Sequence, residues 1–318
     1  MNTPTSGRPS SRLFAACSLF LFTNLLQSAE APRELTLSRE GHWLIIHGKH
    51  LPGAEIRINY LEAYCRAGST DADWVGRTVI RHTNELVALS ANRRELRLRD
   101  VLADGLIVEH VITAGADEVL FALEARNLTS HRSEAHWAQP CVRLGAFTGF
   151  AADHSQGDIN DYLPKCFVFL PAGDPSSKGT GGLRAEEPHL TRMPTPLWAT
   201  TARYMPGQVW AARGVPRTDV NPRPLNAQVP ALGLIGCFSG DNSLIFATAW
   251  EPYQELFQGV ARCLHSDFRL GGVAPGETKR IKGRIYIVAN DVNALLARYR
   301  LDFGASLDSP EAAPTLRR

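Results

Sequence analysis

Apolar and polar residues alternate over much of the first half of this chain. Around residues 54–60, Ile56, Ile58 and Tyr60 alternate with charged or amide residues, which predicts a strand with one face in a core and the other in water. The same period of two recurs in further segments, namely 43–47, 75–82, 86–89, 96–98, 106–112, 119–125 and 139–147. A helical period does not interrupt these segments, and the pattern therefore predicts consecutive antiparallel strands.

The second half of the chain adds predicted strands at 232–238, 244–250 and 279–289. After Asp291, apolar residues recur every three or four positions up to Phe303, which predicts an amphipathic helix docked at the edge or end of a sheet. The predicted fold is all-β: an antiparallel β-sandwich or supersandwich with one C-terminal helix.

A segment rich in proline, glycine and aromatic residues lies between these two parts, at 153–230. Proline cannot donate to a strand ladder, so this composition predicts long loops. Long ordered loops that carry tryptophan and tyrosine are typical of functional sites, and a disordered linker between two domains is the alternative. We expect one domain over 32–305, with these loops folded against it, and a flexible tail at 306–318.

The first residues have the pattern of a secretory signal peptide. Arg8 and Arg12 precede an apolar run at 13–26, and Ala29-Glu30-Ala31 follows it with small residues at the spacing that signal peptidase recognises. The run is shorter than the roughly 20 residues that span a bilayer, so we expect cleavage after Ala31 rather than an anchor. The chain is therefore predicted to be secreted or periplasmic, with no membrane span after cleavage.

Composition and charge narrow the classes of function. With 44% hydrophobic residues the chain can bury a large core. Its 34 Lys and Arg against 32 Asp and Glu leave a net charge of +2, which supplies no basic surface for nucleic acid.

The cysteine pattern argues against a zinc knuckle. One of the six cysteines, Cys17, lies in the signal segment, and five remain: Cys65, Cys141, Cys166, Cys237 and Cys263. They are widely spaced without a CxxC pair, and most lie in apolar, strand-like contexts. We expect mostly buried thiols with at most one bridge.

The densest cluster of polar and aromatic residues is at 250–267. Gln258-Gly259 predicts a two-residue hairpin turn, which would place Glu255 opposite Arg262 and Trp250 opposite Asp267. Glu255 and Arg262 would then form a cross-strand ion pair. His265 and Asp267 would share a face with Trp250, and a histidine oriented by a carboxylate can act as a general acid or base. A solvated histidine at a sheet edge is the alternative.

Two further groups are candidates for binding. His136 lies just before a strand, beside Trp137 and Gln139, a combination that can hydrogen-bond and stack on a sugar, and a structural histidine is the alternative. The oxygen-rich loop at 153–161 would tolerate Ca²⁺ but lacks the spacing of an EF-hand, so the pattern favours a solvated loop. No metal ligand or other cofactor is predicted.

Four stretches carry a resemblance to a known family: 136–141, 219–224, 250–257 and 263–267. They resemble an uncharacterised family of secreted β-sandwich proteins from environmental bacteria that degrade polysaccharides. More loosely, the antiparallel strands with Asn127 and His136 in mid-chain resemble the supersandwich of galactose mutarotases. That resemblance implies sugar-ring opening by a histidine acid, His136 or His265, and a glutamate base, Glu251 or Glu255.

These observations predict a carbohydrate-binding or carbohydrate-active protein, and they fit an enzyme or a binding module. The candidate acid–base residues are His136, His265, Glu251 and Asp267, and the candidate substrate contacts are Trp198, Trp210, Trp250, Tyr253, Arg217 and Arg223. We expect the proline-rich loops to bring them into one depression. One alternative is a non-catalytic glycan-binding or surface-assembly module. The other is a polysaccharide lyase, in which Arg217 and Arg223 would neutralise a uronate.

Overall fold

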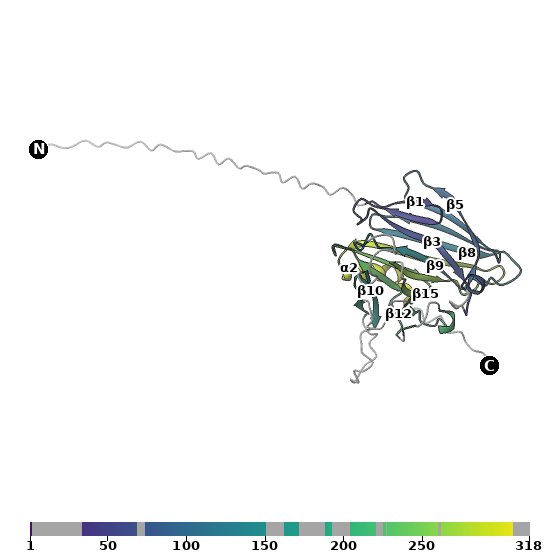
Figure 1. Cartoon of the computed structure of the whole chain (residues 1–318). Helices are drawn as coiled ribbons and strands as arrows, with labels where there is room; N and C mark the ends of the chain where they lie inside the picture. Colours follow the sequence, from purple (N-terminus) through teal and green to yellow (C-terminus); the bar gives the residue numbers. More distant parts are fainter. Residues whose placement is uncertain are drawn as a thin grey trace, which may run out of the picture. The chain divides into compact units, whose positions relative to one another are not determined.

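Two antiparallel sheets packed face to face make up the described part of this protein (Figure 1). The computed structural model describes Met1 and residues 34–68, 74–150, 162–171, 188–192, 204–220, 225–226, 228–259 and 262–307. Residues 1–32 and 33–318 separate as two units, and every strand and helix named below lies in the second. Apart from Met1, the predicted signal peptide lies outside the described residues, as does the tail from residue 308.

Among the described residues, the first sheet has eight strands. In spatial order they are β1 (Thr36–Glu40), β2 (Trp43–His47), β3 (Glu55–Cys65), β9 (Trp137–Arg143), β16 (Cys263–Arg269), β15 (Tyr253–Gly259) and β12 (Tyr204–Ala211), and the short β4 (Val79–Ile80) pairs with β3. The strands β3, β9, β16 and β15 are central, so their outward side chains form one surface.

The second sheet has nine strands within the described residues. Their order is β11 (Pro188–Arg192), β10 (Cys166–Pro171), β13 (Leu234–Phe238), β14 (Leu244–Glu251), β17 (Thr278–Ala289), β8 (Glu118–Asn127), β7 (Leu106–Ala114), β6 (Glu95–Leu102) and β5 (His82–Leu89). Apolar residues from both sheets form the core between them, such as Ile58 and Val142 from the first and Leu98 and Leu123 from the second. The all-β prediction is therefore confirmed.

The sequence alternation translates directly into burial. Along β7 buried and half-buried residues alternate without exception, and Leu106, Val108, His110 and Ile112 face the core as predicted. This follows from the pleat, which points successive side chains to opposite faces.

The proline-rich segment contains more regular structure than its composition predicts. β10, β11 and β12 form there, pairing with β13, β10 and β15 respectively. β11 and β12 lie at the edges of the two sheets, where a missing N–H disturbs no inner ladder. The register also shifts between Tyr204 and Val209, the stretch that contains Pro206.

The predicted helix is present as α2 (Val292–Leu307), and a carboxylate oxygen of Asp291 accepts the Ala294 N–H at 3.0 Å. The helix does not dock at a sheet edge. Its Leu295, Tyr299 and Phe303 pack on apolar residues that project from the outer face of β10, β13, β14 and β17. The second sheet therefore has an apolar outer face that α2 covers. The sequence pattern could not show which element covers it.

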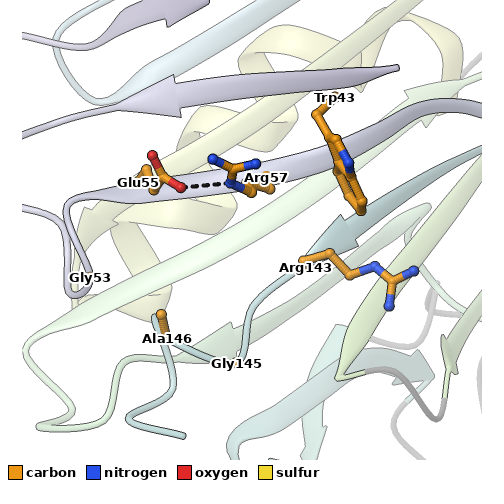
Figure 2. A pocket seen from close by; sticks show the side chains of 7 residues that line it. All are labelled: Trp43, Gly53, Glu55, Arg57, Arg143, Gly145 and Ala146. Carbon is orange, nitrogen blue, oxygen red and sulfur yellow. Dashed lines mark hydrogen bonds and ion pairs between the residues drawn. The ribbon is translucent and has the colours of Figure 1, made fainter. Parts of the chain in front are cut away.

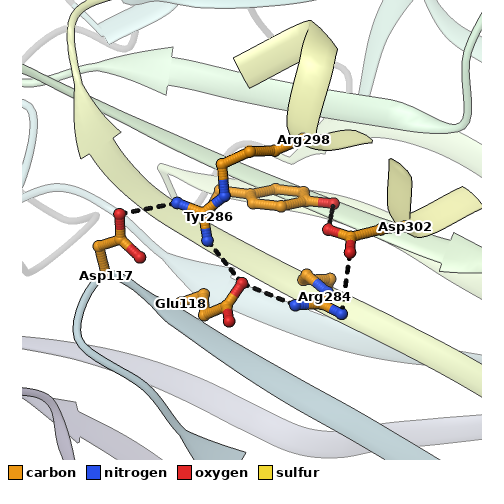
Figure 3. Close-up of polar contacts among 6 residues, drawn as sticks. All are labelled: Asp117, Glu118, Arg284, Tyr286, Arg298 and Asp302. Carbon is orange, nitrogen blue, oxygen red and sulfur yellow. Dashed lines mark hydrogen bonds and ion pairs between the residues drawn. The ribbon is translucent and has the colours of Figure 1, made fainter. Parts of the chain in front are cut away.

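Ion pairs hold the helix in place (Figure 3). Arg298 donates to Asp117 at 2.7 Å and to Glu118 at 2.6 Å. Glu118 also accepts from Arg284 of β17 at 2.7 Å, and Arg284 lies 3.1 Å from Asp302 of the helix. The network thus joins α2, β17 and the start of β8.

The hairpin at 250–267 differs from its prediction. Glu255 pairs with Asp267 and Gly259 with Cys263, so Gln258-Gly259 belongs to β15 and is not the turn. Gly259 is not in the left-handed region, whereas Arg262 has a φ of 49°. A Cβ at Gly259 would lie 2.5 Å from the Sγ of Cys263, so this position requires glycine because the opposite strand approaches closely.

In the described part of the chain, the free cysteines are buried thiols, namely Cys65, Cys141, Cys166, Cys237 and Cys263. Among the described helices, none combines the length and the apolarity needed to cross a bilayer.

Candidate functional site

Polar side chains line the outer face of the first sheet. Residues such as Ile58, Val142 and Leu264 point into the core, so their neighbours along β3, β9 and β16 point outward. The outward set, here called the outer polar row, is Arg57, Asn59, Gln139, Cys141, Arg143, Cys263, His265, Asp267 and Glu255. Most of its members on β9, β16 and β15 are buried, which is unusual for charged groups and typical of a functional site.

The centre of this row is the His265–Asp267 pair. Their side chains are 4% and 0% exposed, and the His265 Nδ1 lies 3.3 Å from the Asp267 Oδ1. The imidazole stacks on Phe257 with a centroid distance of 4.0 Å, and its Nε2 lies 3.5 Å from the Cys263 Sγ. The sequence placed His265 and Asp267 on one face, and the structure brings them together there.

Burial and charge shift the pKa values of this pair. Burial raises the pKa of Asp267 to about 6, although hydrogen bonds from His265 and Gln139 oppose the shift. Burial alone would lower the pKa of His265, but the nearby Cys263 and the hydrogen bond to Asp267 outweigh it and raise that pKa. The buried carboxyl of Asp267 can therefore hold or release a proton near neutral pH.

A pocket of about 410 Å³ opens beside this row (Figure 2). It is lined by Trp43, Gly53, Glu55, Arg57, Arg143, Gly145 and Ala146. The register connects it to the buried pair, because Arg143 of β9 lies between Arg57 of β3 and Cys263 of β16. We call it the Trp43 pocket.

The Trp43 pocket combines an aromatic ring with hydrogen-bonding groups. The guanidinium carbon of Arg143 lies 5.8 Å from the centre of the Trp43 indole, and the indole is half-buried. The Arg57 Nε donates to Glu55 at 2.7 Å, and Arg57 also bonds Glu40 at 3.1 Å. Figure 2 shows the Arg57–Glu55 pair on β3 beside the indole. A ligand in this pocket would contact an indole ring, two guanidinium groups and a carboxylate.

His136 lies at the opposite end of β9 from Arg143. Its backbone N–H donates to the Cys65 carbonyl at 2.8 Å, and its carbonyl accepts from Leu270 and Gly271. Burial, and next the charge of Arg269, lower the pKa of its half-buried imidazole. The structure therefore places His136 outside the cluster around His265.

Glu251 and Tyr253 line a second pocket of about 380 Å³, together with Trp250, Tyr299 and Phe303. Glu251 belongs to β14 of the second sheet and pairs with Lys282 at 3.0 Å. Burial raises the pKa of Tyr253. Glu251 is therefore not a member of the outer polar row, and the predicted pairing of His265 with Glu251 is not assembled there.

Two of the predicted aromatic contacts, Trp210 and Trp250, belong to the core between the sheets. Trp250 is 3% exposed, and its ring lies in the core between Phe121 and Phe268, at centroid distances of 5.1 and 4.9 Å. Trp210 is 1% exposed and points into the same core. The described tryptophans do not line one depression.

The remaining predicted contacts are arginine and tryptophan residues of the proline-rich segment. Arg217 is exposed and donates to the Asn226 carbonyl at 3.3 Å. Trp198, Arg223 and the oxygen-rich loop at 153–161 lie outside the described residues.

Sequence reasoning missed Trp43, Arg57 and Arg143 as members of one site. Arg57 and Arg143 are polar residues in alternating strands, and Trp43 begins a short apolar strand, so each fits an ordinary strand position. What the three residues have in common is a position on the outward face of their strands. Only the pairing of β2, β3 and β9 makes them neighbours.

Comparisons with known proteins give distant structural neighbours. No protein-family model and no curated protein matches the chain. A candidate aldose 1-epimerase from Escherichia coli K12 is 10% identical, over 80% of this chain and 99% of its own, with a TM-score of 0.39. The Slr1438 protein of Synechocystis sp. PCC 6803 is 11% identical, over 81% and 96%, with a TM-score of 0.41. A candidate mutarotase from Salmonella typhimurium is 9% identical, over 82% and 95%, with a TM-score of 0.36. These identities and TM-scores are too low to support an argument about this chain. The fold assignment therefore rests on its own two sheets.

Proposed function

We propose that this chain is a secreted carbohydrate-binding protein and that the saccharide occupies the Trp43 pocket. One observation carries the proposal: an indole, two guanidinium groups and a carboxylate surround a single pocket of about 410 Å³. A sugar ring has an apolar C–H face, which packs on an aromatic plate, and hydroxyls at its edge, which both donate and accept. The pocket offers a partner for each of these features.

The charges in the pocket favour a sugar over a polyanion. Arg57 is already paired with Glu55 at 2.7 Å and with Glu40 at 3.1 Å. Glu55 itself lines the pocket and would repel a phosphate chain. A neutral hydroxyl can instead accept from a guanidinium and donate to the same carboxylate.

Trp43→Ala is expected to weaken saccharide binding about tenfold or more, since an aromatic contact with its buried area is worth roughly 1.5 kcal/mol. Trp43→Phe should keep part of the affinity for saccharide because a smaller aromatic ring remains. Calorimetry against a panel of mono- and oligosaccharides measures both variants.

Arg57→Gln is the companion change, and Arg97→Gln is its matched control. Arg97 donates through its Nε to Glu95 at 2.8 Å, two positions away along β6, which repeats the Arg57–Glu55 geometry on the other sheet. The Arg57 change should weaken binding and the Arg97 change should not. Retention of full affinity by Trp43→Ala, or no binding to any sugar by the wild type, would refute the proposal.

One observation favours a second function, acid–base chemistry on the outer polar row such as sugar-ring isomerisation. Glu255 and Asp267 are direct cross-strand partners on the outer polar row, and both are fully buried. Such partners have Cβ atoms about 4.5–5.5 Å apart. Burial raises the pKa of Asp267 to about 6, so Asp267 can serve as the acid while Glu255 serves as the base. Of the two arginines of the lyase alternative, Arg217 is exposed and donates to a backbone carbonyl, and Arg223 lies outside the described residues.

Asp267→Asn and Glu255→Gln are each expected to slow anomer exchange about 10²–10⁴-fold, the usual contribution of a general acid or base. Exchange is followed by NMR on the sugars that bind. Asp241→Asn, at an exposed turn between β13 and β14, is the control and should leave the rate unchanged. Binding without any exchange by the wild type would eliminate this second function and leave the binding proposal intact.

A further inference from the structure

Two thiols and an imidazole meet on the outer polar row. The ligand atoms of Cys141, Cys263 and His265 all lie within 4.8 Å of one another, and all three residues are buried. Cys263 pairs with Arg143 and Leu264 with Val142, so continuation of this antiparallel register places Cys141 across from His265. Pairing of β9 with β16 therefore brings the three side chains together on one face.

A carboxylate orients the imidazole toward the thiols. The His265 Nδ1 lies 3.3 Å from the Asp267 Oδ1, while the Nε2 lies 3.5 Å from the Cys263 Sγ. A proton on Nδ1, donated to Asp267, leaves the lone pair of Nε2 directed at the thiols. Metal-binding histidines are held in this way by carboxylates, which fix both the tautomer and the ring orientation.

We propose that Cys141, Cys263 and His265 bind a thiophilic metal ion, with Zn²⁺ as the occupant. With Zn–S bonds of about 2.3 Å and Zn–N bonds of about 2.0–2.1 Å, a tetrahedral ion places sulfur and nitrogen ligands about 3.6 Å apart. The separation of 3.5 Å between the Cys263 Sγ and the His265 Nε2 already matches that requirement. Three protein ligands leave the fourth position open to a ligand from outside the triad.

Charge at the cluster fits an ion. Two thiolates and Zn²⁺ sum to zero net charge, which removes most of the penalty for burying thiolates in this enclosed position. Gly259 lies against the cluster, since a Cβ there would lie 2.5 Å from the Cys263 Sγ and 3.9 Å from the His265 Nε2. Any larger residue at this position would therefore collide with the Cys263 ligand.

The other buried thiols provide an internal comparison. Cys166 and Cys237 are direct partners on β10 and β13 in the core, and the Gln258 amide donates to Cys166 at 2.9 Å. In the part of the chain that the structure describes, the Cys141 cluster is the one set of three such ligands that converge. The metal site does not depend on the Trp43 pocket being a saccharide site.

Cobalt titration tests the proposal. The purified full chain, kept reduced and freed of metal, should bind one Co²⁺ with a thiolate-to-cobalt charge-transfer band, and Zn²⁺ should displace it. Cys141→Ser, Cys263→Ser and His265→Ala should each lose about 100-fold or more in affinity, whereas Asp267→Asn should retain the band and lose about 10–100-fold. Cys237→Ala, a buried thiol outside the triad, should bind as the wild type does.

Circular dichroism of each variant confirms that loss of the band is not loss of the fold. Trp43→Ala should keep the cobalt band whatever happens to sugar binding, so the two proposals fail separately. The metal proposal is overturned if the folded wild type gives no charge-transfer band. It is also overturned if Cys141→Ser keeps the band unchanged, or if the protein purified without reductant carries a Cys141–Cys263 disulfide and no zinc.

Discussion

Asp100→Ala is expected to lower the free energy of unfolding by about 3–5 kcal/mol at pH 7, the usual cost of removing one partner of a buried charged pair. Asp100 lies between the sheets and is fully buried. It accepts from the Tyr64 hydroxyl at 2.6 Å and lies 3.1 Å from the Nε2 of His110, whose Nδ1 lies 2.9 Å from the Tyr60 hydroxyl. Alanine would leave buried polar groups without this acceptor.

Urea unfolding measures this loss, and Glu109→Ala is the control. Glu109 pairs with Arg99 at 2.8 Å on the exposed side of the same two strands, so its removal should cost only about 0–1 kcal/mol. A loss below about 1 kcal/mol for Asp100→Ala, similar to that of an exposed pair, would contradict the interpretation of this network.

The network also has a pH signature. Burial alone would raise the pKa of Asp100, but the charge of His110 and the hydrogen bonds from His110 and Tyr64 outweigh burial and lower it. A lowered pKa gives stability that is present above the unfolded value of about 3.9 and is lost as pH falls through the folded value. The stability difference between the wild type and Asp100→Asn should therefore narrow below about pH 4.

Trp250→Ala is expected to destabilise the protein by about 3–5 kcal/mol, because it empties a large space in the core. The indole packs between Phe121 of the second sheet and Phe268 of the first. It also lies directly on Gly283 of β17, where an added Cβ would overlap the ring. Gly283→Ala should therefore destabilise the protein through the same contact.

Thermal and urea unfolding check this result, with Trp43→Ala as the control. Trp43 is half-buried at the rim of its pocket, so its removal should cost far less stability than removal of Trp250. If Trp250→Ala instead abolished saccharide binding and left stability unchanged, Trp250 would be a ligand contact, as the sequence pattern suggested, and its assignment to the core would be wrong.

Local patterns predicted the elements of the fold well. The period of two in β7 and the capping Asp291 before α2 act within a few residues, so neither depends on distant pairing. The face to which His110 belongs was predicted in the same way. What such a pattern does not contain is the partner of each face, which is why α2 was expected at the edge or end of a sheet.

The hairpin register shows where local reasoning fails. Gln258-Gly259 has the composition of a tight turn, but Gly259 is required by the approach of Cys263 from the opposite strand. A cross-strand contact exists only once the register is chosen, so the residues of the turn alone cannot reveal it. The same error placed Trp250 on the hairpin, although Pro252 separates β14 of one sheet from β15 of the other.

The candidate metal ligands illustrate the same limit. The wide spacing of Cys141 and Cys263, without a CxxC pair, predicted no metal site. Because β9 pairs with β16, the two cysteines are close in space although they are far apart in the sequence. The Trp43 pocket arises in the same way from β2, β3 and β9.

The sequence by itself determined that this protein is an antiparallel β-sandwich with one amphipathic helix, and it selected His265 and Asp267 as a pair, because alternation and capping are local properties of the chain. Only the tertiary structure decided which tryptophans are core and which polar side chains meet outside it. Those outcomes depend on strand order and register, which are set by contacts between residues far apart in the sequence.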